Sequence, residues 1–309
     1  MQITRLGPVF GAEISGVDLG RLDDGTFAAI RQALVDHEVL VFKNQTLDTD
    51  IQSAFGRRFG ELIVHHFSRA VVEARPELMV LDTNRDRPDP LTDIWHADET
   101  YRAAPPMATV LRSIIVPELG GNTMFASMRA AYEGLSSRMK DYVTGLTAVH
   151  GFGRFRHRFE DDPSLLPILH EIELANPVSS HPVVTVHPES GRRVLYVNWH
   201  FTTRINGLPE VESRVILDYL RNRVLQPEYQ LRVAWEPDML VVWDNRSVQH
   251  YAPKDYYPQH RQMERVTIAG AVPIGAPSTG PLEIPRVVVQ GVAEERRSAA
   301  PTTPAVAVG

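Results

Sequence analysis

The chain has 309 residues, of which 43% are hydrophobic and 23% are charged, and its formal net charge is −6. This length and composition allow a sizeable buried core and predict one ordinary globular domain. Because charges of one sign do not gather in long runs, the sequence favours neither a nucleic-acid surface nor a polybasic membrane patch. A small organic molecule is therefore the expected partner.

Cysteine is absent from the sequence. This excludes disulfide frameworks, thiolate metal ligands and cysteine nucleophiles, so any metal site must use histidine and carboxylate. The first residues lack an apolar signal core, and no apolar run approaches the roughly 18 residues that span a bilayer. We therefore expect a cytoplasmic protein with no membrane and no nucleic acid among its partners.

The N-terminal part shows strand and helix patterns in alternation. Residues 1–20 contain short β-like pieces separated by glycine, which predict an opening hairpin or edge strand. Apolar residues three and four apart predict an amphipathic helix over 24–37, and the apolar run 38–42 predicts a buried strand. A second helix over 49–59 is predicted to be capped by Asp48.

The next part contains two predicted strands, at residues 78–81 and 108–116. Between them, the polar, proline-containing segment 84–93 is interpreted as a lid or substrate-selecting loop. A helical pattern over 127–146 follows and is expected to cover a face of the core.

Residues 151–182 are polar and irregular, which predicts helices or loops outside the sheet. Residues 183–186 and 194–197 then predict a hairpin, because a turn sequence joins two β-rich runs. Alternating apolar residues over 229–235 predict a half-buried strand, and 239–243 predicts a further strand.

Between these strands, Pro209 is expected to open a helix with an apolar face. The residues predicted to share that face are Val211, Val215, Ile216, Tyr219 and Leu220.

Many short strands, several helices and no strand-helix-strand rhythm predict a mainly β fold with flanking helices. We interpret residues 1–274 as a single domain. Residues 275–309 are rich in proline, alanine and valine, which is typical of a mobile C-terminal tail, with one short strand expected at 287–289.

A His-x-Asp element at His96 and Asp98 is the first candidate for chemistry. Side chains two residues apart lie on the same side of an extended segment, so these two can hold one ion. A third ligand from a distant strand, His250, would complete a set of two histidines and one carboxylate. That set leaves positions open for substrate and dioxygen, as in non-heme Fe(II) oxygenases.

Alone, His-x-Asp is a weak signal in a chain with 12 histidines. His187 and Glu189 have the same spacing, but the proline and the Ser-Gly turn around them predict a solvated hairpin tip. Arg261 and Arg265 follow His250 by 11 and 15 residues and strengthen the first candidate.

Three motifs together resemble one known family. They are Trp-His-x-Asp at 95–98, Gly-Gly-Asn-Thr at 120–123 and Trp-Asp-Asn-Arg-x3-His at 243–250, with two trailing arginines. This combination resembles the taurine/2,4-dichlorophenoxyacetate dioxygenases, which depend on Fe(II) and 2-oxoglutarate, from about Leu6 to Gly270. The resemblance implies a double-stranded β-helix, a cupin-like jelly-roll that holds the metal in its open mouth, and often a dimer or tetramer.

The resemblance also implies roles for single residues. His96, Asp98 and His250 would be the iron ligands. Arg261 would bind the distal carboxylate of 2-oxoglutarate, because a planar guanidinium makes two charge-assisted hydrogen bonds to one carboxylate. The hydroxyl of Thr123 would assist it.

Arg265 lies four residues after Arg261 in a strand-like segment, so both are expected on the same face of the sheet. Two cations side by side repel each other unless each has an anion, which predicts a second anionic ligand, the substrate. In the family that this chain resembles, the matching arginine binds a sulfonate or sulfate. A histidine that aligns with His66, or less closely with His65, assists it.

The implied reaction decarboxylates 2-oxoglutarate to succinate and CO2 with O2 and hydroxylates a substrate C–H bond. The sequence departs from taurine dioxygenase where Arg69 replaces an aromatic residue and where 91–94 reads Leu-Thr-Asp-Ile. A larger or more apolar anion than taurine is therefore expected: an alkyl sulfate, another sulfonate or an aryloxyalkanoate.

Two other functions remain open on the same ligands. A hydrolase could use Zn²⁺ at two histidines and a carboxylate, although this leaves Arg261 and Arg265 without a role. A cupin-like binding or sensor protein could hold metal without turnover. Oxygen uptake that depends on 2-oxoglutarate separates both from a dioxygenase.

Overall fold

The computed structural model describes residues 1–64, 75–84, 93–151 and 166–277. The chain divides into two compact units, Met1–Thr279 and Gly280–Gly309. The strand predicted at 287–289 lies outside the described residues. Among the described helices, none has the length and apolar character needed to cross a membrane.

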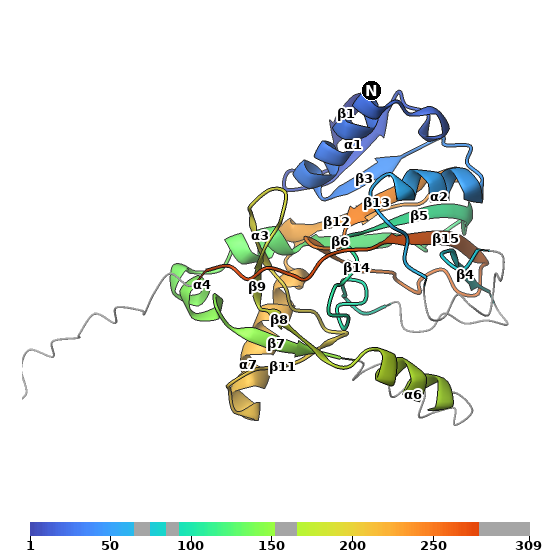
Figure 1. Ribbon diagram of the computed structural model, residues 1–309. Helices are drawn as coiled ribbons and strands as arrows, with labels where there is room; N and C mark the ends of the chain where they lie inside the picture. Colours follow the sequence, from blue (N-terminus) through green and yellow to red (C-terminus); the bar gives the residue numbers. More distant parts are fainter. Residues whose placement is uncertain (65–74, 85–92, 152–165, 278–309) are drawn as a thin grey trace, which may run out of the picture. The chain divides into compact units, whose positions relative to one another are not determined.

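A seven-stranded sheet forms the centre of the first unit, in the order β1-β2-β3-β13-β5-β15-β4 (Figure 1). Its neighbours pair antiparallel, except β2 and β3, which are parallel. The strands are β1 (Gln2–Arg5), β2 (Ala12–Ser15), β3 (Val39–Phe42), β4 (Met79–Thr83), β5 (Ala108–Ile115), β13 (Leu240–Asp244) and β15 (Arg261–Ile268).

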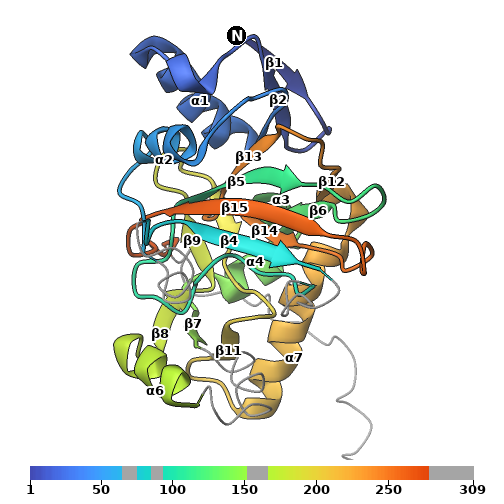
Figure 2. The same cartoon turned by 90° about the vertical axis from the view of Figure 1, so that its right-hand side faces the viewer.

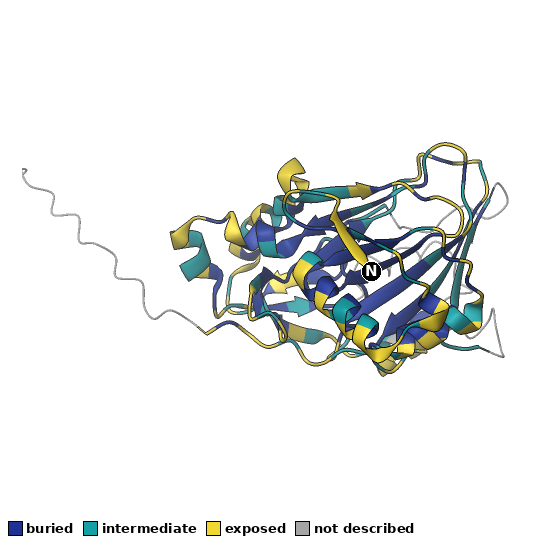
Figure 3. Cartoon of the chain, turned by 90° about the horizontal axis from the view of Figure 1, so that it is seen from above, coloured by how far each residue is buried: buried dark blue, intermediate teal, exposed yellow. Residues whose placement is uncertain are grey.

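Helices α1 (Asp24–His37) and α2 (Thr49–Arg57) cover one face of this sheet. Alternate strand residues, such as Leu40 and Phe42, pack against them. Figure 3 shows these buried strands beneath helices whose outer faces are exposed. Both helices were predicted, and Asp48 caps α2 by accepting a hydrogen bond from the Ile51 N–H at 2.8 Å.

The other face of the sheet packs against a three-stranded sheet, β12-β6-β14. Its strands are β12 (Gln230–Val233), β6 (Thr123–Ser127) and β14 (Val248–Tyr251). The core between the sheets contains Val39, Val41, Phe125, Trp243 and Met263, and the rings of Phe125 and Trp243 lie 5.5 Å apart. Strands β3 and β13 are therefore buried on both faces. The two sheets form the frame of the candidate site.

Two smaller sheets and several helices complete the unit, and the three-stranded sheet among them lies below this frame in Figure 2. They comprise β11-β7-β8 with β7 (Thr147–His150), β8 (Ser179–Pro182) and β11 (Thr202–Ile205); β9 (Val184–Val186) paired with β10 (Arg193–Leu195); and α3 (Met128–Glu133), α4 (Ser137–Val143), α6 (Leu166–Ala175), α7 (Glu210–Arg221), η1 (Leu19–Arg21), η4 (Asn222–Leu225) and η5 (Pro227–Tyr229). The predicted β9–β10 hairpin is confirmed.

Three local predictions are wrong. Strand β8 lies within the segment expected to be outside the sheet, and pairs with β7. Tyr229 ends a 3-10 helix instead of starting the strand that begins at Gln230. The third concerns α7: Val211, Val215 and Tyr219 are 64%, 62% and 44% exposed. The buried face of α7 contains Ser213, Leu217, Leu220 and Arg221.

Candidate active site

His96 and His250 meet through their backbones. The His96 N–H donates to the His250 carbonyl at 3.1 Å, and the His250 N–H donates to the His96 carbonyl at 2.8 Å. Their ring centroids lie 4.1 Å apart. A backbone bridge of this kind fixes two residues that are far apart in the sequence with little freedom between them. It therefore sets the distance between the two imidazoles.

Asp98 completes the cluster. Its Oδ1 atom lies 3.8 Å from Nε2 of both imidazoles, and one donor atom from each of the three residues lies within 4.8 Å of the others. The Asn245 side chain holds the Asp98 backbone, accepting from its N–H at 2.6 Å and donating to its carbonyl at 3.0 Å. The hydroxyl of Thr109 donates to Asp98 Oδ2 at 2.8 Å. Oδ1 is thus left to face the imidazoles.

The charges of the cluster suit a cation. Burial lowers the pKa of His96, and burial together with His96 lowers the pKa of His250 to about 3, so both imidazoles are neutral at pH 7. Burial raises the pKa of Asp98, but the Arg265 guanidinium and the two imidazoles lower it more, and the carboxylate stays ionised. Metal ions bind neutral imidazole and ionised carboxylate. A metal ion could therefore bind this cluster at pH 7 without displacing a proton from any of the three side chains.

Arg265 lies beside this carboxylate. Its Nη1 donates to Asp98 Oδ1 at 3.1 Å, and its buried Nε has no hydrogen-bond partner among the described residues. Met263 and Arg265 lie on the inner face of β15, which faces β6 and β14, whereas Glu264 on the outer face binds Arg112. A largely buried guanidinium with an unused N–H is suited to an anionic ligand.

Arg261 begins the same strand and is 5% exposed. Its Nε donates to the Gly121 carbonyl at 3.0 Å, and its guanidinium carbon lies 5.7 Å from the centroid of the Tyr256 ring. Thr123 on β6 is also buried, and its hydroxyl accepts a hydrogen bond from Trp235 Nε1 at 3.0 Å. Both predicted cosubstrate residues therefore lie buried on strands of the two facing sheets.

The glycine pair of the Gly-Gly-Asn-Thr motif makes room for Arg261. A Cβ on Gly121 would lie 2.7 Å from Pro117 Cγ and 3.2 Å from Arg261 Cδ. Gly120 and Gly121 also have φ of +81° and +65°, a region that other residues rarely adopt. The Gly121 N–H donates to Asp255 Oδ1 at 2.9 Å, which holds the turn against the segment that precedes β15.

His187 and Glu189 do not form a second metal site, but the reason differs from the prediction. His187 is 4% exposed, not solvated, and its Nε2 lies 2.9 Å from Asp244 Oδ2. Glu189 pairs with Arg246 at 2.8 Å. Within the described residues, His96, Asp98 and His250 are the one group of three such donors close enough for a metal. The predicted positions His65, His66 and Arg69 lie outside the described residues.

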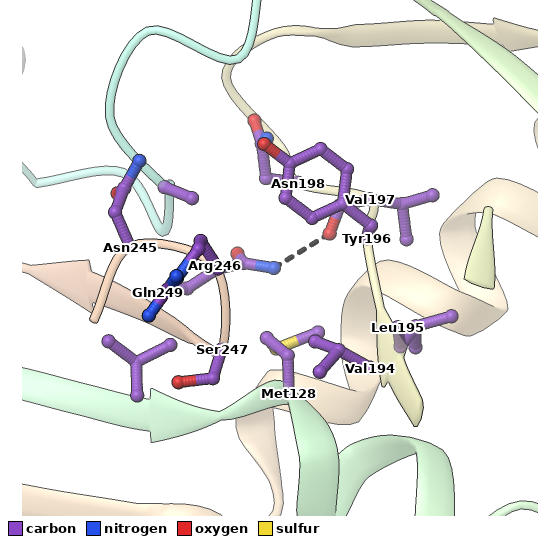
Figure 4. A pocket seen from close by; sticks show the side chains of 12 residues that line it. Met128, Val194, Leu195, Tyr196, Val197, Asn198, Asn245, Arg246, Ser247 and Gln249 are labelled. Atoms are coloured by element: carbon purple, nitrogen blue, oxygen red, sulfur yellow. Dashed lines mark hydrogen bonds between the residues drawn. The ribbon is translucent and has the colours of Figure 1, made fainter. Parts of the chain in front are cut away.

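A small cavity lies beside the cluster, lined by Ala97 and Gln249 among others (Figure 4). Its volume of about 10 Å³ suits one water molecule and is too small for an organic acid. The Gln249 amide N–H donates to the Val197 carbonyl at 2.7 Å, whereas its buried Oε1 has no partner among the described residues. This cavity is therefore not the substrate pocket.

Sequence reasoning gave no role to Asn245, Thr109 or the buried pair His150 and His181. His150 Nδ1 lies 3.0 Å from the Thr100 hydroxyl, and His181 Nε2 lies 2.9 Å from the Thr100 carbonyl. These contacts tie the segment after Asp98 to β7 and β8. At Thr109 and His150 the sequence signal was a polar residue beside apolar strand residues, and such a residue does not identify its partner.

These buried histidines predict how stability depends on pH. Burial lowers the pKa of His150 well below 6.5 and also lowers that of His181. The unfolded chain therefore binds more protons below pH 6.5, so the free energy of unfolding falls as the pH falls. We expect His150 to contribute a loss of at most about 1.4 kcal/mol per pH unit below pH 6.5, and His181 to add a smaller loss of the same sign.

Urea unfolding of the metal-free protein at pH 7 and pH 5 measures this loss. His150→Asn, if it folds, should show a smaller loss over the same interval, whereas His170→Asn, a change of an exposed histidine on α6, should leave it unchanged. Equal stability of the parent chain at the two pH values would contradict the expectation.

Comparison with known proteins agrees with this geometry. The model of the taurine catabolism dioxygenase TauD, TfdA family matches residues 2–267. An alpha-ketoglutarate-dependent sulfate ester dioxygenase from Pseudomonas putida is 37% identical over 270 residues, covering 86% of this chain and 88% of that protein. A crystal structure of a taurine dioxygenase from Burkholderia xenovorans has a TM-score of 0.76 and 34% identity, covering 90% of this chain and 93% of that one.

A further crystal structure, of AAD-2 in complex with Mn(II) and N-oxalylglycine, has a TM-score of 0.73 and 28% identity over 89% of this chain and 99% of that one. The family match covers well over half of the present chain, and the relatives are matched over most of their own length. The predicted family is thus confirmed. The chain belongs to the taurine catabolism dioxygenase TauD, TfdA family and is a 2-oxoglutarate-dependent dioxygenase that uses a metal.

Proposed function

We propose that the protein uses Fe(II), O2 and 2-oxoglutarate to hydroxylate a C–H bond of a small organic anion, such as an alkyl sulfate, a sulfonate or an aryloxyalkanoate. The observation that carries the proposal is Arg265, whose side chain is 11% exposed, beside the cluster of His96, Asp98 and His250. A metal site alone fits many functions. A metal site with a guanidinium at its edge fits an anionic substrate.

The three donors fit a metal that keeps part of its coordination sphere open. With bonds of about 2.1 Å, neighbouring donors on an octahedral metal lie ~3.0 Å apart. The donors at 3.8 Å would thus each move by less than ~1 Å. His96 Nδ1 lies 2.7 Å from the Ile94 carbonyl, which favours the tautomer with its proton on Nδ1 and a lone pair on Nε2. His96, Asp98 and His250 would hold the ion.

Arg261 and Thr123 would bind the distal carboxylate of 2-oxoglutarate. The guanidinium supplies a charge-assisted pair of hydrogen bonds, and the hydroxyl supplies one more. Trp235 already donates to that hydroxyl at 3.0 Å, so its own proton remains to donate to a carboxylate oxygen. The Gly121 carbonyl accepts from the Arg261 Nε, which fixes the guanidinium against the glycine turn.

Arg265 would bind the anionic group of the substrate, and His66 or His65 would assist it. The bound metal with 2-oxoglutarate supplies the oxidation of the C–H bond, with succinate and CO2 as coproducts. The chain itself orients the substrate carbon and excludes water from a site lined by buried residues. When the oxidised carbon carries a sulfate, sulfonate or aryloxy group, the hydroxylated product loses that group and leaves a carbonyl compound.

The same proposal extends to the architecture. The facing sheets would form the double-stranded β-helix of cupin-like proteins, with residues 1–274 as one catalytic domain and 275–309 as a tail. The facing-sheet core supports this, although Gly275 also forms a bridge to Thr185. A dimer or tetramer would be the assembled form.

The test is anaerobic binding of Fe(II) and 2-oxoglutarate, followed by a screen for succinate release with alkyl sulfates, sulfonates and aryloxy acids. We expect substrate-dependent succinate release with at least one of these classes. Metal binding without any effect of 2-oxoglutarate on oxygen uptake would instead favour a zinc hydrolase or a cupin-like sensor. Release with neutral compounds alone would contradict the role of Arg265.

A further inference from the structure

The chain bends sharply just after the candidate metal ligand Asp98. Glu99 has a φ of +47°, in the left-handed region that side chains of this size rarely adopt. Such a conformation is unfavourable by itself and persists only where the surrounding structure holds the residues on both sides. On one side, the Asn245 side chain bonds the backbone of Asp98 at 2.6 and 3.0 Å. On the other side lies Thr100, which is fully buried.

A closed ring of hydrogen bonds holds the Thr100 hydroxyl. The Asn198 amide donates to this hydroxyl at 2.9 Å, and His150 Nδ1 lies 3.0 Å from it. His150 Nε2 lies 3.4 Å from the Thr202 hydroxyl, which accepts from the Asn198 N–H at 2.9 Å and completes the ring. All four residues are at most 3% exposed. The ring therefore joins the segment after Asp98 to β7 and β11 in the interior of the protein.

A neutral His150 satisfies this ring. Burial lowers the pKa of His150 well below 6.5, so the imidazole is uncharged at pH 7. A neutral imidazole donates from one nitrogen and accepts at the other, and each threonine hydroxyl can do either. The Thr100 carbonyl is a further anchor, because His181 Nε2 lies 2.9 Å from it. Thr100 is thus held through both its side chain and its backbone.

We propose that Thr100 is a positioning residue that fixes the Asp98 carboxylate for metal binding. This inference rests on the proposed function. Asn245 and Thr100 hold the two sides of the bend, which keeps Asp98 Oδ1 at 3.8 Å from both imidazoles. Without the Thr100 anchor, the bend relaxes toward a common backbone conformation and the carboxylate loses its fixed direction. A metal ion needs its donors in one geometry, so its affinity falls.

The experiment compares two substitutions of Thr100. Thr100→Val keeps the branched shape and removes the hydroxyl, whereas Thr100→Ser keeps the hydroxyl. Thr144→Val is the matched control, because Thr144 is also buried and its hydroxyl donates to the Lys140 carbonyl at 2.6 Å, at the end of α4. Calorimetry measures Mn(II) binding to the full-length, metal-free protein. Urea unfolding of the same samples measures stability.

We expect Thr100→Val to bind Mn(II) about tenfold more weakly than the unaltered protein, whereas Thr100→Ser should stay within ~3-fold of it. Thr100→Val and Thr144→Val should both unfold at a lower urea concentration, because each leaves a buried polar group without its partner. Only Thr100→Val should lose metal affinity. A loss of stability alone would not produce this difference between the two variants.

Unchanged Mn(II) affinity in Thr100→Val would overturn the proposal, as would an equal loss in Thr144→Val or Thr100→Ser. If circular dichroism shows that Thr100→Val does not fold, Thr202→Val opens the same ring from β11 and should weaken Mn(II) binding by at least ~3-fold. Unchanged affinity in that variant would then refute the role of the ring. These results leave the proposed function standing. If the unaltered protein binds no Mn(II), the proposed function and this inference both fail.

Discussion

Asp98→Ala is expected to abolish succinate formation, with a loss of at least ~10³-fold, and to weaken metal binding severely. Asp98 supplies the only carboxylate of the three-donor cluster, and its Oδ1 is 3.8 Å from both imidazoles. The loss of its charge leaves a cation between two neutral ligands and next to the guanidinium of Arg265. Calorimetric titration with Fe(II) under anaerobic conditions measures the loss of metal affinity directly.

The same substitution should also destabilise the metal-free protein. Arg265 pairs with Asp98 at 3.1 Å, and both side chains are nearly buried, at 11% and 4% exposure. Leaving such a charge unpaired costs about 3–5 kcal/mol. Asp98→Ala combined with Arg265→Met should recover most of this stability but no metal affinity, which separates the structural role of Asp98 from its role as ligand.

Asp50→Ala is the control, because this aspartate is exposed and paired with Arg75 on the surface. It should leave metal affinity and unfolding unchanged. Full metal stoichiometry in Asp98→Ala would show that the carboxylate is not a ligand.

The sequence predicts correctly those parts of the fold in which the spacing of apolar residues along the chain determines the secondary structure. Helices α1 and α2 follow from apolar spacing and from an aspartate cap, and β3 follows from an uninterrupted apolar run between them. The pairing of His96 with Asp98 could likewise be predicted locally, because side chains two residues apart on an extended segment lie on the same side.

The failures share a different cause, namely partners far away in the sequence. In α7, apolar Val211 and Val215 face outward, whereas the polar Ser213 is buried because its hydroxyl accepts from the Ile205 N–H at 2.8 Å. His187 precedes turn residues that predict exposure, yet Asp244, 57 residues later, holds it in the interior. Asn245 is likewise defined by its contact with Asp98. No periodicity encodes such contacts.

Arg261→Ala is expected to raise the concentration of 2-oxoglutarate required for half-maximal turnover by ~10²–10³-fold, because a bidentate charge-assisted pair is lost. Arg261→Lys should recover only part of this, since a lysine cannot make the paired contact. Arg261 lies at the Gly121 turn, whereas Arg265 lies at Asp98, so the two cations serve different places in the site.

Arg265→Ala should therefore show the opposite pattern. The KM for the prime substrate is expected to rise by ~10²-fold, while the requirement for 2-oxoglutarate changes by less than ~3-fold. Steady-state kinetics with each ligand varied in turn measures the four constants, and Arg57→Ala, a surface arginine paired with Glu77, is the control. Equal effects of both substitutions on both ligands would refute the assignment of one anion to each guanidinium. The two arginines lie on one strand and differ in their buried contacts. If each substitution weakens the binding of a different ligand, the two guanidinium groups must bind separate anions.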